Sequence, residues 1–92
     1  MTERWQFAAT DILLRGWEGQ MVAYDRRSGD THCLDVVSSA LVACLMETTV
    51  GTRYELRDAV ARDIDAGAEI DTLLSGALRE LERLDLVRRL PD

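Results

Sequence analysis

The side chains best suited to catalysis in this chain are His32 and Cys33, which are adjacent in the sequence. A cysteine next to a histidine suggests a nucleophile activated by a base, and this requires the two side chains to lie within hydrogen-bond reach. The segment from Thr31 to Leu34 is predicted to be a strand, in which neighbouring side chains point to opposite faces of a sheet. His32 is therefore expected on the same face as Leu34 and away from Cys33. The sequence predicts no catalytic dyad and a protein that is not an enzyme.

Metal-binding and phosphate-binding patterns are also missing from the sequence. Cys44 recurs with apolar residues at helical spacing, which predicts a place in the core. The chain has two cysteines and one histidine, too few to form a tetrahedral zinc site. The acidic residues between Asp58 and Asp71 lack the ligand order of a calcium-binding loop, and no glycine-rich phosphate loop occurs. We therefore expect no metal and no cofactor.

The composition is that of a folded domain that does not bind nucleic acid. The chain has 92 residues, of which 47% are hydrophobic and 30% charged, as expected for one globular domain spanning residues 1–92. Its formal net charge of −6 argues against nucleic acid, whose phosphates attract basic proteins. The sequence has no long apolar run and no secretory signal pattern, so we expect no membrane span and a cytoplasmic location.

Three short segments in the first third of the chain have the composition of strands. They are residues 12–17, 21–25 and 31–34, and turn residues separate them. Short connections make neighbouring strands antiparallel, so the three segments are predicted to form a meander. The outer edge of the last strand lacks the lysine or proline that often protects such edges. That edge is a candidate docking site for a partner strand.

Three helices are expected after the strands. Asp35 is a predicted N-cap that accepts the backbone N–H of Val37 or Ser38, and Thr52 with Glu55 has the form of a capping box. Apolar spacing predicts a first helix that ends near residues 48–51 and a third over about 70–84. The second begins at the Thr52 cap, and its apolar stripe runs from Leu56 to Ile64.

Leu86 and Val87 are expected to end the third helix and to add apolar side chains to the core. Three strands followed by three helices predict an α+β fold that is winged-helix-like, a three-stranded antiparallel sheet followed by a three-helix bundle.

Four arginines gather toward the C-terminus, namely Arg79, Arg83, Arg88 and Arg89. Two interpretations remain open for them. They support the third helix through its dipole and through pairs with nearby glutamates, or they form an electrostatic dock for an acidic partner.

The layout resembles PqqD-like proteins, the peptide chaperones or recognition elements of pathways that modify ribosomal peptides. The ending Leu78-x-x-Leu81-Glu82-Arg83-Leu84-Asp85-Leu86-Val87 is similar to that family's pattern, with Asp85 where glycine is common. Trp5, the segment 12–17 and the string Ser28-Gly29-Asp30-Thr31-His32-x-Leu34-Asp35 resemble the subgroup found beside HPr-kinase-related proteins. The resemblance covers about Trp5 to Leu90.

The resemblance implies a peptide-binding module. In that family the leader segment of a precursor peptide adds as a strand to the third strand, in a groove walled by the third helix. On this chain the strand residues are Thr31, His32, Cys33 and Leu34. Helix geometry places Leu73, Ala77 and Leu84 at one margin of the third helix's apolar arc, with Glu80 just beyond. These four residues are the expected wall, unless the core of this small domain uses all of its leucines.

Other functions stay open at this stage. The expected partners are the precursor peptide and its modifying enzyme, for which an HPr-kinase-related protein is one candidate. The alternatives are a winged-helix DNA-binding domain, which needs a basic recognition helix, and a homodimeric adaptor whose edge strands pair with each other.

Overall fold

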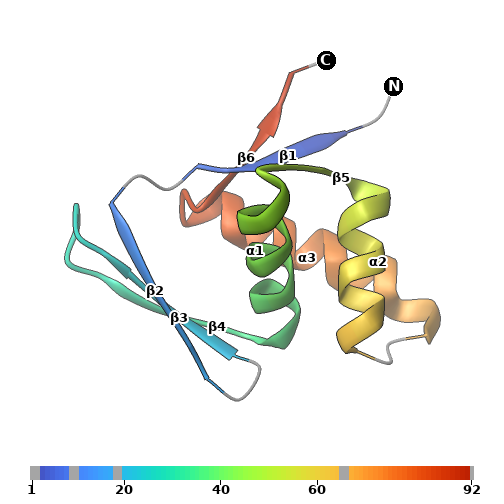
Figure 1. The fold of residues 1–92 in the computed structure, drawn as a ribbon, viewed down its shortest axis with the longest axis horizontal. Helices are drawn as coiled ribbons and strands as arrows, with labels where there is room; N and C mark the ends of the chain where they lie inside the picture. Colours follow the sequence, from blue (N-terminus) through green and yellow to red (C-terminus); the bar gives the residue numbers. More distant parts are fainter. Residues whose placement is uncertain (1–2, 9–10, 18–19, 65–66, 92) are drawn as a thin grey trace.

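The computed structural model describes residues 3–8, 11–17, 20–64 and 67–91 of the 92-residue chain (Figure 1). In chain order the elements are β1 (Arg4–Phe7), β2 (Ile12–Trp17), β3 (Gln20–Asp25), β4 (Thr31–Leu34), α1 (Val36–Thr48), β5 (Val50–Thr52), α2 (Arg53–Asp63), the 3-10 turn η1 (Gly67–Glu69), α3 (Ile70–Arg83) and β6 (Val87–Leu90). The predicted α+β class, with a three-stranded antiparallel meander and three helices, is confirmed.

Strands β2, β3 and β4 form the predicted meander, with β3 in the middle and antiparallel pairing on both sides. The predicted bounds of β2 and β4 are confirmed, and β3 begins at Gln20, one residue before the predicted start. Ala23 lies opposite Leu14 on β2 and opposite His32 on β4. Because Ala23 is fully buried and α1 contacts β3 and β4, this face of the sheet packs against the helical part.

A second antiparallel sheet brings the two ends of the chain together, and the sequence analysis did not predict it. Strand β1 is central, with β5 on one side and β6 on the other. Residues 50 and 51, expected at the end of the first helix, belong to β5, and Val87 begins β6 rather than ending the third helix. These strands have three or four residues, too few for a periodic pattern, and their stability depends on partners distant in sequence.

Gly51 allows this second sheet to lie close to the helices. A Cβ atom at Gly51 would stand 3.2 Å from Cδ2 of Leu45 and 3.3 Å from Cδ2 of Leu56, a contact that requires the leucines to shift. On β1, Trp5 lies opposite Gly51 and, on its other side, opposite Arg89. Trp5 is 4% exposed, so its indole is the main apolar contribution of β1 to the core.

Helices α1 and α2 begin at the predicted caps. The Asp35 carboxylate accepts the backbone N–H of Ser38 at 2.7 Å. Thr52 and Glu55 form the reciprocal capping box, in which each side chain accepts the other residue's backbone N–H. Both signals are local in sequence, which is why they are readable before the fold is known.

Helix α3 ends in a Schellman motif centred on Asp85. The N–H of Leu86 donates to the carbonyl of Leu81, and the N–H of Asp85 donates to that of Glu82, both at 3.0 Å. Asp85 has a φ of +60°, the left-handed conformation that glycine adopts most easily and aspartate tolerates. The aspartate therefore occupies a position whose backbone favours glycine.

The core lies between the helices and the two sheets. Its fully buried large side chains are Leu41, Leu45, Leu56, Leu74, Leu78, Leu81, Leu86, Val42 and Val60. The expectation that Leu86 and Val87 add to the core is confirmed. Among the described residues, no helix is long and apolar enough to cross a membrane.

Candidate functional site

Strand β4 is an edge strand, and its outer side meets no other strand in the described part of the chain. Its side chains alternate as predicted. Leu34 is buried and His32 half-buried on the inner face, while Thr31 and Cys33 are exposed. His32 and Cys33 therefore diverge, which agrees with the expectation that they form no dyad.

The two ends of the β3–β4 ladder show which pairs exchange backbone hydrogen bonds. At the turn, the N–H of Asp25 donates to the carbonyl of Asp30 at 2.8 Å. At the other end, the Ser39 hydroxyl of α1 accepts the N–H of Met21 at 2.9 Å and donates to the carbonyl of Leu34 at 3.3 Å. The hydroxyl thus bridges two backbone groups that face each other across the ladder.

Pairs of this kind recur at every second position of an antiparallel ladder. Ala23 and His32 lie midway between the two end pairs, so the N–H and C=O of His32 face β3. Those of Thr31 and Cys33 face the opposite way, toward the open edge. The groups offered to a partner strand are therefore the backbone donors and acceptors of Thr31 and Cys33.

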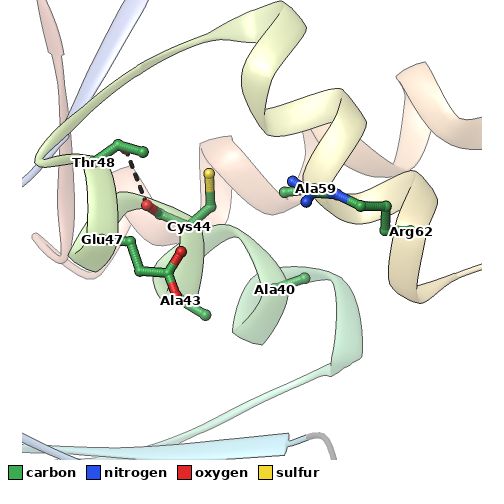
Figure 2. A pocket seen from close by; sticks show the side chains of 7 residues that line it. All are labelled: Ala40, Ala43, Cys44, Glu47, Thr48, Ala59 and Arg62. Carbon is green, nitrogen blue, oxygen red and sulfur yellow. Dashed lines mark hydrogen bonds between the residues drawn. The ribbon is translucent and has the colours of Figure 1, made fainter.

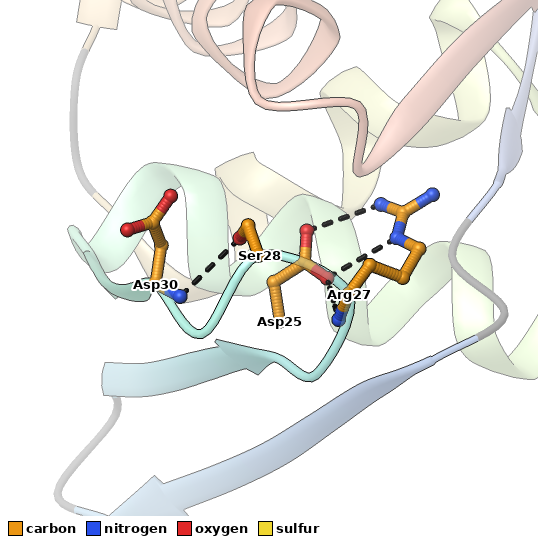
Figure 3. Close-up of polar contacts among 4 residues, drawn as sticks. All are labelled: Asp25, Arg27, Ser28 and Asp30. Atoms are coloured by element: carbon orange, nitrogen blue, oxygen red, sulfur yellow. Dashed lines mark hydrogen bonds and ion pairs between the residues drawn. The ribbon is translucent and has the colours of Figure 1, made fainter.

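The turn between β3 and β4 is held by one carboxylate (Figure 3). Asp25 accepts the backbone N–H of Arg27 at 2.9 Å and two bonds from the Arg27 guanidinium at 3.1 Å. These bonds lower the pKa of Asp25 against the opposing effect of burial. Gly29, at a φ of +79°, turns the chain so that its N–H donates to the Asp25 carbonyl. This compact turn fixes the register of β4.

The predicted wall residues of α3 divide into two groups. Leu73 is 38% exposed and Leu84 is half-buried at the border of the core. Ala77 is 7% exposed and belongs to the core cluster, so its side chain offers little surface to a ligand. Glu80 is exposed and makes two hydrogen bonds with the guanidinium of Arg83.

The carboxylate of Glu80 on α3 is stabilised by the charges around it. The hydrogen bonds from Arg83 are the main cause of a lowered Glu80 pKa, and the charge of His32 lowers it further. On α3, Leu73 and Leu84 lie on the same side of the helix as Glu80.

A hollow between α1 and α2 contains the half-buried Cys44 (Figure 2). Small side chains form much of it, and Glu47 and Arg62 lie at its border. Burial raises the pKa of the Cys44 thiol, which disfavours the reactive thiolate. No cluster of three or more metal-ligating side chains occurs in the described residues.

The C-terminal arginines do not form one cluster. Arg83 pairs with Glu80, and Arg88 donates to the side chain of Gln6 at 3.4 Å. Arg89 lies 5.8 Å from the centre of the Trp5 ring. Arg79 and Arg89 line a common hollow with Arg53, a residue whose proximity to Arg79 the sequence does not predict because 26 positions separate the two.

The comparisons with known proteins bear on the fold. No family model and no curated protein matches the chain. Among solved structures, the chain is similar to that described as "TbiB1 in Complex with the TbiA(beta) Leader Peptide", with 20% sequence identity and a TM-score of 0.71. The match covers 94% of this chain and 99% of the other. The chain therefore shares, over nearly its whole length, the fold of a protein solved with a leader peptide.

Proposed function

We propose that residues 1–92 act as a single PqqD-like, non-catalytic domain that captures the leader segment of a precursor peptide in the cytoplasm. The leader adds as a strand to the outer edge of β4 and lies against α3. The observation that carries this proposal is the unpaired edge of β4, where the backbone groups of Thr31 and Cys33 face outward. The shared fold with a protein whose structure contains a leader peptide supports it.

Each proposed contact residue has a distinct role. Thr31 and Cys33 pair with the peptide backbone. The backbone groups of His32 and Leu34 face β3 instead, and the buried side chain of Leu34 holds the strand against the core. Leu73 and Leu84 supply apolar surface on α3, and Glu80 contributes charge at the border. Ala77 is buried in the core, so its small side chain adds little surface to the groove.

These contacts fit a binder of moderate strength. Roughly four backbone hydrogen bonds contribute about 1 kcal/mol each. One or two leucine-sized anchors add about 1.5–3 kcal/mol each, and ordering the peptide takes several kcal/mol back. The net binding free energy stays below the ~8 kcal/mol of a micromolar complex, so the expected dissociation constant lies between micromolar and millimolar.

The second proposed partner is the enzyme that modifies the precursor. The string Ser28–Asp35 supports placing the chain in the subgroup found beside HPr-kinase-related proteins. A protein of that kind is accordingly the first enzyme partner to test. In this role the chain presents the bound leader and takes no part in the chemistry.

Titration with synthetic leader peptides tests the proposal. Precursor peptides encoded beside the gene supply the sequences, and backbone amide shifts report the contact site. Perturbations should centre on β4 and the Leu73–Leu84 side of α3, and affinity should change only mildly with salt because backbone pairing dominates. Perturbations confined to other surfaces, or a steep salt dependence, would contradict the proposal.

Two other functions have less support. DNA binding requires a basic helix, but α3 carries Asp71, Glu80 and Glu82 against Arg79 and Arg83. A homodimer formed by β4 edges uses the same unpaired backbone groups. To distinguish such a homodimer from a leader-binding monomer, the molecular mass in solution is measured at low and high protein concentration, with and without leader peptide.

A further inference from the structure

A second polar hollow lies where β1, β6 and the start of α2 meet α3. Its residues include Trp5, Arg53, Ser75, Leu78, Arg79 and Arg89, and its volume is about 390 Å³. We call it the arginine hollow after Arg53, Arg79 and Arg89. These three guanidinium side chains come from α2, α3 and β6, so the fold brings together charges that are far apart in the sequence.

Two of the three arginines are held in place by neighbours. Arg53 donates to the hydroxyl of Ser75 and, at 3.3 Å, to the backbone carbonyl of Asp71. Arg89 lies over the Trp5 ring, 5.8 Å from its centre, in a cation–π contact. Positioned side chains lose less conformational freedom when a ligand binds.

Two donors in the hollow lack partners within the described residues. Arg79 makes no hydrogen bond or ion pair there. The indole of Trp5 is 4% exposed, and its Nε1–H is buried without an acceptor. A buried donor without an acceptor is uncommon and costs stability. A ligand that brings oxygen acceptors supplies what Arg79 lacks, and it lies beside the ring of Trp5.

The charges around the hollow favour an anion. Glu3 and Glu82 also line it, so three guanidinium groups face two carboxylates. Glu3 is 4.0 Å from Arg89 with both side chains about half exposed, a weak pair that a ligand can displace. The chain as a whole carries a net charge of −6, so the hollow is a local positive site on an acidic protein. The rest of the acidic surface repels an extended nucleic acid more strongly than a short acidic peptide segment, because the longer polyanion places more charge near that surface.

The arginine hollow and the proposed leader groove lie on opposite sides of α3. At 100° per residue, Ser75 points about 160° away from Leu73, and Arg79 about 100° away from Glu80. In Figure 1, β1 and β6 lie at the top and β4 at the lower left. A ligand in one site therefore leaves the other open.

We propose that the arginine hollow docks an acidic segment of the modifying enzyme, with its carboxylates on Arg79 and Arg89, while the leader occupies β4. The identity of the docking protein rests on the proposed function. The chemistry of the hollow does not, because it follows from its three guanidinium groups.

A hexaglutamate peptide is the probe, and a hexaglutamine peptide is its uncharged counterpart. Hexaglutamate should bind the full chain, shift the Trp5 indole N–H resonance and lose affinity as salt rises. A Trp17→Phe variant assigns that resonance by leaving one tryptophan. Arg79→Gln should weaken hexaglutamate about tenfold, and Arg62→Gln, which removes the same charge beside the α1–α2 hollow, should not.

Three results would overturn the inference. The first is equal affinity of the Arg79→Gln and Arg62→Gln variants for hexaglutamate. The second is binding of hexaglutamine as tight as that of hexaglutamate. The third is displacement of hexaglutamate by inorganic phosphate or a single-stranded oligonucleotide at a concentration below that of hexaglutamate. Leader titration of the same variants keeps the two proposals separate. Arg79→Gln should leave leader affinity unchanged. If no variant binds the leader, the proposed function is rejected. The hexaglutamate titration then still decides whether the arginine hollow binds an acidic segment.

Discussion

The hydroxyl of Ser39 lies 2.9 Å from the backbone nitrogen of Met21 and accepts its N–H. The same hydroxyl donates to the carbonyl of Leu34, so one side chain of α1 closes the far end of the β3–β4 ladder. Ser39 is 4% exposed, so water has little access to the two backbone groups and cannot readily replace the hydrogen bonds of the hydroxyl. The bridge ties the edge strand to the first helix and agrees with the pairing set at the turn, in which the backbone groups of Thr31 and Cys33 face outward.

Ser39→Ala should therefore cost about 1–3 kcal/mol of the free energy of unfolding, because it leaves a buried donor and acceptor unpaired. Urea denaturation measures the loss, and the Met21 amide should exchange faster with solvent. The neighbouring Ser38→Ala is the matched control, since Ser38 is equally buried but its hydroxyl makes none of these bonds. Equal losses in the two variants would show that the bridge is unimportant.

Leu78 and Leu73 should separate stability from binding. Leu78 is 1% exposed and Leu73 38% exposed. Leu78→Ala should cost about 2–5 kcal/mol of unfolding free energy through the cavity it leaves. Leu73→Ala should cost less, and should weaken leader binding about tenfold if it loses one apolar anchor. Similar destabilisation with unchanged leader affinity would remove Leu73 from the groove.

Asp85→Gly should stabilise the domain. The left-handed backbone at Asp85, with φ at +60°, costs a residue with a Cβ atom more than it costs glycine. Glycine also makes the unfolded chain more flexible, which offsets part of the gain. The expected net increase in the free energy of unfolding is up to about 1 kcal/mol. Thermal unfolding measures it, with Asp85→Ala as the control that should destabilise. A lower melting temperature for Asp85→Gly would mean that the aspartate side chain contributes more than its backbone strain removes.

The Asp25 carboxylate should make stability depend on acid pH. Its pKa in the folded protein is lowered, chiefly by the side-chain hydrogen bonds from Arg27. Such a carboxylate stabilises the fold above its unfolded pKa, near 3.8, and that stability is lost as the pH falls through the lowered folded value. Urea denaturation at pH 6 and pH 3 should show a smaller difference for Asp25→Asn than for the unaltered chain. Asp30→Asn, in the same turn but outside any described ion pair, should behave like the unaltered chain.

Much of the fold is readable from the sequence because its signals are local. The caps at Asp35 and Thr52 and the turn at Ser28–Asp30 each lie within a few residues of the groups they bind. The second sheet is different, since Trp5 pairs with Gly51 and Arg89, whose positions along the chain reveal nothing of the pairing. Only the folded helices bring these segments together.

The sequence predicts the strand and the helix of the candidate site, but not which of their backbone groups and side chains are accessible. Alternation along 31–34 places His32 and Cys33 on opposite faces, as the structure has them. Which backbone groups of β4 face outward depends on the hydrogen bonds of the β3–β4 turn and cannot be obtained from the strand sequence alone. Helical spacing puts Leu73 and Ala77 at the same margin of the apolar face of α3. In the folded domain, however, Ala77 is buried and Leu73 is exposed. The arginine hollow combines three distant segments. Arg79 and Arg89 belong to the C-terminal arginines that the sequence offers as an electrostatic dock, whereas nothing in the sequence connects Arg53 with them.

A proline scan of β4 tests the docking edge directly, because proline removes one backbone N–H. The N–H of His32 faces β3, so His32→Pro should break the ladder. A loss of about 2 kcal/mol lowers the melting temperature of a domain this size by roughly 8–16 °C. The N–H of Cys33 faces the open edge, so Cys33→Pro should melt within a few degrees of the unaltered chain yet lose leader affinity by about tenfold or more.

Cys33→Ala is the control for Cys33→Pro, since it keeps the backbone donor and changes only an exposed side chain on the outer face of the sheet. It should bind leader peptide as the unaltered chain does. Thr31→Pro shares the outward parity of Cys33 and should repeat its effect on binding. If Cys33→Pro and Thr31→Pro stay folded and still bind the leader with unaltered affinity, the peptide does not pair with β4, and the edge of Thr31–Leu34 serves another purpose.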